Sequence, residues 1–267
     1  MNFFYAIILG IVEGITEFLP ISSTGHLIII GEFISFPEPF GTTFDIVIQL
    51  GAILSVVFYF FDRLNPFSKS IDYHQKQEIY DLWKKTFIAL IPAILIGGLL
   101  GRKIQEFLFN PTVVAIMLFV GGIILIFLEK KQRNEKFQKI RDMSWLNAFY
   151  IGLFQSLAMV PGTSRSAATI IGAMLLGSSR VLAAEFSFFL AIPTMFAASA
   201  YSLYKQGFAF SNSELIILIT GFLTAFVVAY LVVKIFMKYI SNHNFVPFGY
   251  YRIALGAVVI IFIYIIK

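Results

Sequence analysis

The chain has 267 residues, of which 58% are hydrophobic and 13% are charged, whereas a soluble domain carries about 25% charged residues. This composition excludes an ordinary soluble domain and predicts an all-α polytopic membrane protein with a single membrane domain over residues 1–267, and the absence of cysteine excludes disulfides and cysteine-based metal sites. The net charge of +5 arises in a few connecting segments, since no Lys or Arg precedes Arg63, so it indicates membrane orientation and argues against a nucleic-acid partner.

The first apolar segment, residues 3–33, is interrupted near its middle by the polar stretch "PISSTGH". Each half is too short to cross a hydrocarbon core of about 30 Å, which takes roughly 20 apolar residues of helix. We therefore expect a re-entrant helix–loop–helix hairpin whose turn is buried in protein or lines a wet cavity. Because it lacks a positively charged start and contains Glu13 and Glu17, we interpret it as mature protein and not as a signal peptide.

The rest of the chain predicts six transmembrane helices and a second hairpin. The hairpin covers residues 146–177 and is interrupted by "PGTSRS". The predicted spans are 43–61, 86–101, 112–128, 183–205, 214–239 and 250–266.

The connections between these segments differ in positive charge. Segments 62–85 and 129–145 are rich in Lys and Arg, whereas 31–42 and 206–213 contain none. The positive-inside rule places the two basic connections in the cytoplasm. The first hairpin is then expected to enter the membrane from outside and the second from inside.

The two halves of the chain resemble inverted copies, repeat one covering about 1–128 and repeat two about 146–267. Each half is one hairpin followed by three spans, and an odd number of spans inverts the second copy. Inverted repeats with broken helices bind their ligands where the breaks meet. The matches are Gly10 and Glu13 with Gly152 and Gln155 at an offset of 142, Pro20, Ser22 and Ser23 with Pro161, Thr163 and Ser164 at 141, and Asp45 with Glu185 at 140.

Glu13 and Glu17 are spaced i,i+4 and share one helix face. Two adjacent carboxylates in a low-dielectric place require a proton or a cation between them, and Mg²⁺ or Ca²⁺ prefers such oxygen ligands. The alternative is that both face water or bond to neighbouring helices. Ionisable residues inside a membrane segment favour a functional role.

The hydroxyls after Pro20 indicate the start of a new helix. Ser22 or Ser23 can cap it, and its N-terminus forms an anion site. Ser23 and His26 are spaced i,i+3, a candidate nucleophile with a candidate base. In the alternative interpretation Ser22, Ser23 and Thr24 are only caps, and His26 is a satisfied buried histidine.

In the second hairpin, Arg165 is the only charged side chain in residues 144–178. Burying a lone guanidinium is costly unless it meets an anion, and its planar fork suits phosphate oxygens. Thr163, Ser164 and Ser166 surround it as hydrogen-bond donors.

An internal salt bridge from Arg165 to Glu13 or Glu17 is the alternative partner, and it is compatible with phosphate binding. If the two tips meet, they form an intramembrane pocket for a multiply charged anion with an apolar tail. A lipid phosphate or pyrophosphate has this chemistry.

The stretches "EGITEFLPISSTGH" and "PGTSRSAATI" resemble the two signature motifs of bacterial undecaprenyl pyrophosphate phosphatase (undecaprenyl-diphosphatase), the bacitracin-resistance protein type. The resemblance continues through "TFDIVIQLGAILSVV" and "AAEFSFFLAIPTM". It implies a divalent-cation-dependent hydrolase in the bacterial plasma membrane, with a pocket that opens to the outer side. Such an enzyme converts undecaprenyl pyrophosphate to undecaprenyl phosphate and inorganic phosphate. The product is the lipid carrier that is recycled for peptidoglycan synthesis.

By motif, the resemblance implies that Glu13 and Glu17 are the paired acidic residues and metal ligands. Ser23 is then the nucleophile, His26 an acid/base helper and Arg165 a phosphate ligand. Attack by Ser23 and direct attack by metal-bound water both remain open. The remaining expected phosphate-binding residues are Ser22, Thr24, Thr163, Ser164 and Ser166.

The main alternative function is a transporter or flippase of a phosphorylated polyprenyl lipid, since inverted repeats are usual in transporters. A second lipid-phosphatase superfamily places a histidine nucleophile after a Ser-Arg pair, but Ile171 occupies that position here. Asp45, Gln49 and Glu185 are expected either to line the pocket or to be helix-start residues. A homodimer is the assembly that we keep open.

Overall fold

The computed structural model describes residues 2–68, 71–131, 135–206 and 210–263. These residues form helices joined by turns, and within these ranges the only β-structure is an isolated bridge between Phe137 and Ser178. The predicted all-α class is therefore confirmed. The helices are α1 (Asn2–Thr16), α2 (Ser23–Gly31), α3 (Phe40–Tyr59), α4 (Phe61–Leu64), α5 (Tyr73–Leu108), α6 (Pro111–Lys130), α7 (Trp145–Ser156), α8 (Arg165–Leu176), α9 (Arg180–Gln206), α10 (Asn212–Ile240) and α11 (Val246–Ile261), with 3-10 turns η1 (Ile140–Asp142) and η2 (Leu157–Met159).

Within the described ranges, 5 helices are long and apolar enough to cross a membrane: α3, α5 over Tyr73–Gly101, α6, α9 and α10. Each of them overlaps one of the six predicted spans. The sixth, 250–266, corresponds to α11, which begins earlier, at Val246, and has 16 residues. Residues 264–266 of that prediction lie outside the described residues.

The helix that contains the second predicted span, α5, begins at Tyr73, well before residue 86. Residues 73–85 are amphipathic, so their charges suggested a connection. Their buried face includes Ile79 and Leu82, and the Lys85 ammonium is buried where it donates to the Ile140 carbonyl at 2.7 Å. The buried face explains why this polar segment is helical.

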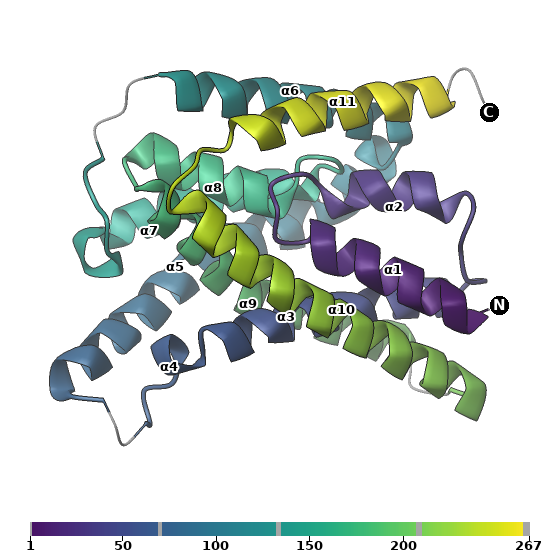
Figure 1. Ribbon diagram of the computed structural model, residues 1–267, viewed down its shortest axis with the longest axis horizontal. Coiled ribbons are helices and arrows are strands. Elements are labelled where there is room, and N and C mark those ends of the chain that lie inside the picture. Colours follow the sequence, from purple (N-terminus) through teal and green to yellow (C-terminus); the bar gives the residue numbers. More distant parts are fainter. Residues whose placement is uncertain (1, 69–70, 132–134, 207–209, 264–267) are drawn as a thin grey trace.

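Both predicted helix–turn–helix hairpins are present, as α1–α2 and α7–α8 (Figure 1). The second helix of each is capped by a serine with positive φ, 72° at Ser22 and 66° at Ser164. Each cap accepts a hydrogen bond from the backbone N–H three residues on, a standard way to satisfy a helix start.

The matching caps correct the repeat alignment. Ser22 corresponds to Ser164, an offset of 142, so the offset of 141 that paired Ser23 with Ser164 was wrong at this point. The sequence alignment matched residues that carry hydroxyl groups, whereas the backbone matches the two N-cap residues. Ser23 and Arg165 consequently occupy the same place, the first residue of α2 and of α8.

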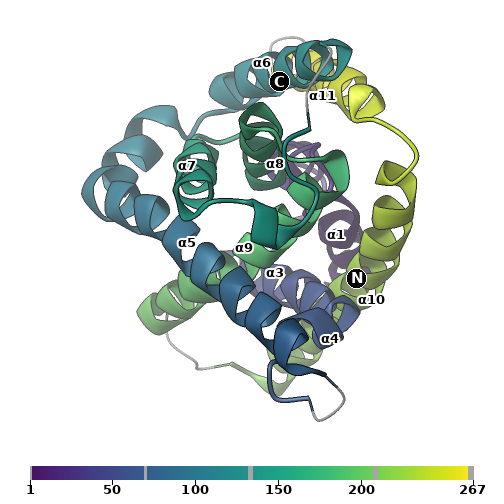
Figure 2. The same ribbon diagram turned by 90° about the vertical axis from the view of Figure 1, so that its left-hand side faces the viewer.

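The hairpins lie against long helices on opposite sides of the molecule, α1 along α10 and α7 along α5 (Figures 1 and 2). Helices α6 and α11 pair across the hairpin tips, and α3 packs on α9. Glycine permits both close approaches. A Cβ on Gly10 would lie 2.8 Å from the Gly221 oxygen, and one on Gly152 would lie 2.0 Å from the Ala89 oxygen.

We expect Gly152→Ala to lower the midpoint of thermal unfolding in detergent, because the added methyl forces α7 away from the α5 backbone at a cost of about 1–3 kcal/mol. Gly98→Ala is the matched control, since a Cβ at Gly98 meets nothing within 4 Å. Equal midpoints for the two variants would contradict the close contact between α7 and α5.

Candidate active site

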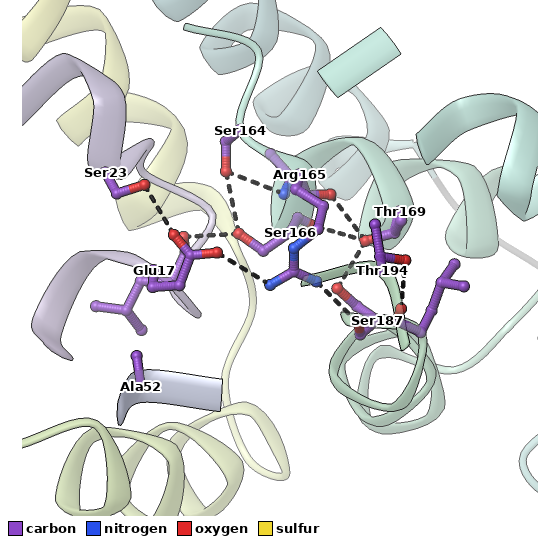
Figure 3. A network of polar contacts seen from close by, with 12 residues as sticks. Glu17, Ser23, Ala52, Ser164, Arg165, Ser166, Thr169, Ser187 and Thr194 are labelled. Atoms are coloured by element: carbon purple, nitrogen blue, oxygen red, sulfur yellow. Dashed lines mark hydrogen bonds and ion pairs between the residues drawn. The ribbon is translucent and has the colours of Figure 1, made fainter. Parts of the chain in front are cut away.

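The two hairpin tips meet through the Glu17 carboxylate (Figure 3). Its Oε1 accepts a hydrogen bond from Arg165 Nη2 at 3.4 Å, and its Oε2 accepts one from Ser23 Oγ at 2.9 Å. The side chains of Arg165 and Glu17 are only 12% and 9% exposed. The ion pair that was the alternative interpretation of Arg165 is therefore present, with Glu17 as its partner. One carboxylate joins the first residue of α2 to the first residue of α8.

The Arg165 guanidinium is held on several sides. Its Nη1 donates to the Ser187 carbonyl at 3.0 Å, and its Cζ lies 6.0 Å from the centre of the Phe18 ring. Its Nε is buried and has no hydrogen-bond partner in the described part of the chain. The guanidinium is thus oriented in advance and keeps a free donor for an anion.

The two serines of the second tip, Ser164 and Ser166, make different hydrogen bonds. Ser166 Oγ donates to the Leu19 carbonyl at 2.9 Å, a second direct link between the tips. Its proton is used there, so Ser164 Oγ is the donor in the 3.0 Å contact between the two hydroxyls. The Thr163 hydroxyl is buried without a partner among the described residues.

Glu13 is fully buried, and no N–H or hydroxyl group of the described ranges donates a hydrogen bond to its carboxylate oxygens. Glu17, Asp45 and Arg165 are the charged groups that interact with it. A buried carboxylate without hydrogen bonds requires a proton or a cation, which fits the expected Mg²⁺ or Ca²⁺. The described residues contain no group of three or more acidic or histidine side chains that could hold a metal alone, so a cation on Glu13 and Glu17 would need further oxygen ligands from water or from bound phosphate.

His26 lies beside Tyr251 of α11. Its Nδ1 is 2.8 Å from the Ser22 carbonyl and its Nε2 is 2.7 Å from the Tyr251 hydroxyl, with the two rings stacked. A carbonyl only accepts, so Nδ1 carries a proton, and in the neutral ring Nε2 accepts from Tyr251. The Ser23 hydroxyl bonds to Glu17 and not to His26. The geometry therefore makes Glu17 the base nearest to the candidate nucleophile.

Sequence reasoning missed Arg252 of α11, which is fully buried at the tips. Its guanidinium donates to the carbonyls of Pro20 in the first tip and of Gly162 and Thr163 in the second. The available signal was a charged residue at the start of an apolar helix, which favours a functional role. Tyr251 carries no comparable signal.

The pocket-lining candidates separate in the structure. Asp45 interacts with Glu13 and lines a small cavity of about 90 Å³ together with Glu38. Glu185 pairs with Arg63 and lines a different cavity of about 570 Å³ with Arg141. Of its two expected roles, pocket lining and helix start, the structure does not support a place in the pocket of the tips.

Comparison with known proteins identifies a family. A family model described as bacitracin resistance protein BacA matches residues 6–258. The chain is 53% identical to undecaprenyl-diphosphatase 1 of Clostridioides difficile, over 100% of this chain and 98% of that protein. It is 52% identical to the undecaprenyl-diphosphatase of Lachnoclostridium phytofermentans over 95% and 94%, and 47% identical to that of Enterococcus faecalis over 97% and 96%. Because these matches run along nearly its whole length, the chain belongs to the family of the bacitracin resistance protein BacA.

Proposed function

We propose that this chain is a membrane undecaprenyl-diphosphatase, which hydrolyses undecaprenyl pyrophosphate to undecaprenyl phosphate and inorganic phosphate. Family membership and the named activity of the relatives support the proposal. The observation that carries it is the Glu17 carboxylate, which contacts Ser23 at 2.9 Å and Arg165 at 3.4 Å. A hydroxyl, a base and a phosphate-binding guanidinium thus lie together. The activity returns the lipid carrier to peptidoglycan synthesis and accounts for bacitracin resistance.

The reaction is phosphoryl transfer, in which positioning and charge neutralisation supply most of the catalysis. Ser23 Oγ attacks the terminal phosphorus and its proton passes to Glu17. The bond from phosphorus to the bridging oxygen breaks, and the lipid leaves as the monophosphate. Arg165 and the N–H groups at the start of α8 stabilise the charge on the phosphoryl oxygens. Water then cleaves the phosphoserine. A water molecule activated by Glu17 in place of Ser23 would give the same products.

The Glu13 and Glu17 carboxylates would hold the divalent cation, with phosphate oxygens of the substrate as further ligands. When bound, such a cation neutralises charge on the transferring phosphoryl group. The unpartnered oxygens of Glu13 support this assignment. Ser22 and Ser164 cap the helices, while Thr24 and Thr163 remain predicted phosphate ligands.

We also infer an inverted repeat of six spans and two re-entrant hairpins in the bacterial plasma membrane. The matched caps Ser22 and Ser164 and the matched glycines Gly10 and Gly152 support it. The basic connections then face the cytoplasm and the pocket opens outward. The homodimer stays a prediction, which a mass measurement in nanodiscs checks.

We expect Ser23→Ala to lower the rate of phosphate release from undecaprenyl pyrophosphate by more than about 100-fold, because the nucleophile is lost. The assay is run in detergent, where there is no second compartment, so activity there also contradicts a pure transporter. Ser241→Ala, at an exposed helix end, is the control. A fully active Ser23→Ala enzyme would remove the covalent route in favour of attack by water.

Arg165→Lys is expected to lower kcat/KM about 100- to 1,000-fold, since a point charge replaces the fork that neutralises the phosphoryl oxygens. Arg141→Lys, with its side chain 58% exposed, is the control. If Arg165→Lys and Ser23→Ala both kept wild-type rates, the phosphatase assignment to these tips would be wrong.

Glu13→Gln is expected to raise the Mg²⁺ concentration for half-maximal phosphate release at least about tenfold, because it removes a charged ligand. Binding of Mn²⁺, followed by electron paramagnetic resonance without substrate, should weaken in parallel. Glu214→Gln, at the start of α10, is the control. An unchanged metal requirement for Glu13→Gln would exclude the proposed ligand role.

A further inference from the structure

Arg252 is a fully buried arginine that pairs with no carboxylate in the part of the chain that the structure describes. A buried guanidinium normally meets an anion or several strong acceptors. Here all its partners are backbone carbonyls. They come from three separate segments: the first tip, the second tip and α6.

The distances show how one guanidinium joins these segments. Nη1 donates to the Pro20 carbonyl at 3.3 Å, in the first tip. Nη2 lies 3.1 Å from the Gly162 carbonyl and 3.0 Å from that of Thr163, both in the second tip. Nη2 also lies 3.0 Å from the Met117 carbonyl of α6. The two tips are therefore joined at their backbones by one planar group.

These carbonyls stand just before the residues of the proposed reaction. Pro20 precedes Ser23 by three residues, and Thr163 precedes Arg165 by two. In a trans peptide the C=O and the next N–H point in opposite directions. With the Thr163 carbonyl on Arg252, the N–H of Ser164 points away from it. Fixing this peptide therefore fixes the direction in which α8 starts.

Helix α6 is shaped to admit the guanidinium. A Cβ on Gly121 would lie 2.4 Å from Arg252 Nη2 and 2.9 Å from Cζ. Glycine is unfavourable in a helix interior compared with alanine. The missing side chain at Gly121 thus leaves room for the Arg252 guanidinium. This observation is independent of the hydrogen bonds and supports the same position for the group.

We propose that Arg252 is a positioning residue, which holds the two tips in register so that Ser23 and Glu17 of one face the same phosphate as Arg165 of the other. The inference rests on the proposed phosphatase function. Arg252 touches none of the reacting groups in the structure and acts through the Pro20, Gly162 and Thr163 carbonyls. Lysine cannot replace it, because a single ammonium lacks the span of a planar fork.

The first test is kinetic and uses Arg252→Lys and Gly121→Ala, the second of which displaces the guanidinium without removing it. We expect kcat per folded molecule to fall about 100-fold in each, the effect of misplacing reacting groups by about 1 Å. KM should change less than about threefold, since misalignment of the tips removes interactions of the transition state more than binding of the ground state. Gly98→Ala, a glycine of α5 with open space around it, should stay within about twofold of wild type.

The second test does not use enzyme activity and measures how fast a disulfide forms between the two tips. Because the chain has no cysteine, Leu19→Cys and Ser166→Cys introduce one pair across the contact between the tips. We expect the disulfide of this pair to form about tenfold more slowly in the Gly121→Ala background than in the Gly98→Ala background. A merely stabilising role would lower the unfolding midpoint and leave the rate for folded protein unchanged.

The outcomes separate the two claims. Wild-type protein that releases no phosphate refutes the proposed function, while the disulfide rates still decide the positioning role. Normal kcat with unchanged disulfide formation in Gly121→Ala overturns the inference about Arg252. If Arg252→Lys fails to fold, Gly121→Ala carries the same comparison.

Discussion

A break inside a membrane helix exposes backbone N–H and C=O groups that hydrocarbon cannot satisfy, so they must find partners within the protein. In this chain, backbone groups at the two hairpin tips find hydrogen-bond partners in the opposite tip and in Arg252. The Leu19 carbonyl of the first tip accepts a hydrogen bond from the Ser166 hydroxyl of the second, and the Arg252 guanidinium donates hydrogen bonds to carbonyls of both tips. Ser22 and Ser164 close the helix starts. The long helices around them bring these two loops to one place.

The charges at the tips do not balance, and the imbalance is informative. Arg165 pairs with Glu17, and among the described residues no cation lies within salt-bridge distance of the fully buried Glu13. A diphosphate that enters would add negative charge beside that carboxylate. Binding is favourable only if a cation or a proton accompanies it, since like charges at short range in a low dielectric repel strongly. The carboxylate pair thus supports the proposed divalent cation, to which a proton on one of the two carboxylates is the alternative.

The features that we could predict from the sequence depend on residue types that lie close together in the chain. Both helix–turn–helix hairpins follow from polar stretches inside apolar segments, and an ion pair of Arg165 with Glu13 or Glu17 was one of two interpretations of that arginine. The N-terminal part of α5 was not predicted as helix because residues 73–85 are charged on one face and buried on the other. Arg252 was missed for another reason. Its partners are main-chain carbonyls far away in the chain, and these leave no side-chain pattern to detect.

The capping serines suggest how one local device serves two purposes. Each hairpin places a helix N-terminus at the shared site, and a helix N-terminus attracts anions whatever its side chains are. The first residues of the two helices carry different chemistry, Ser23 in α2 and Arg165 in α8. One copy thereby presents the proposed nucleophile and the other a fixed positive charge. Because Glu17 contacts both, a shift of either tip alters the hydrogen bond of the nucleophile and the ion pair of the arginine together. The reacting geometry is therefore a property of the contact between the tips, and neither hairpin holds it alone.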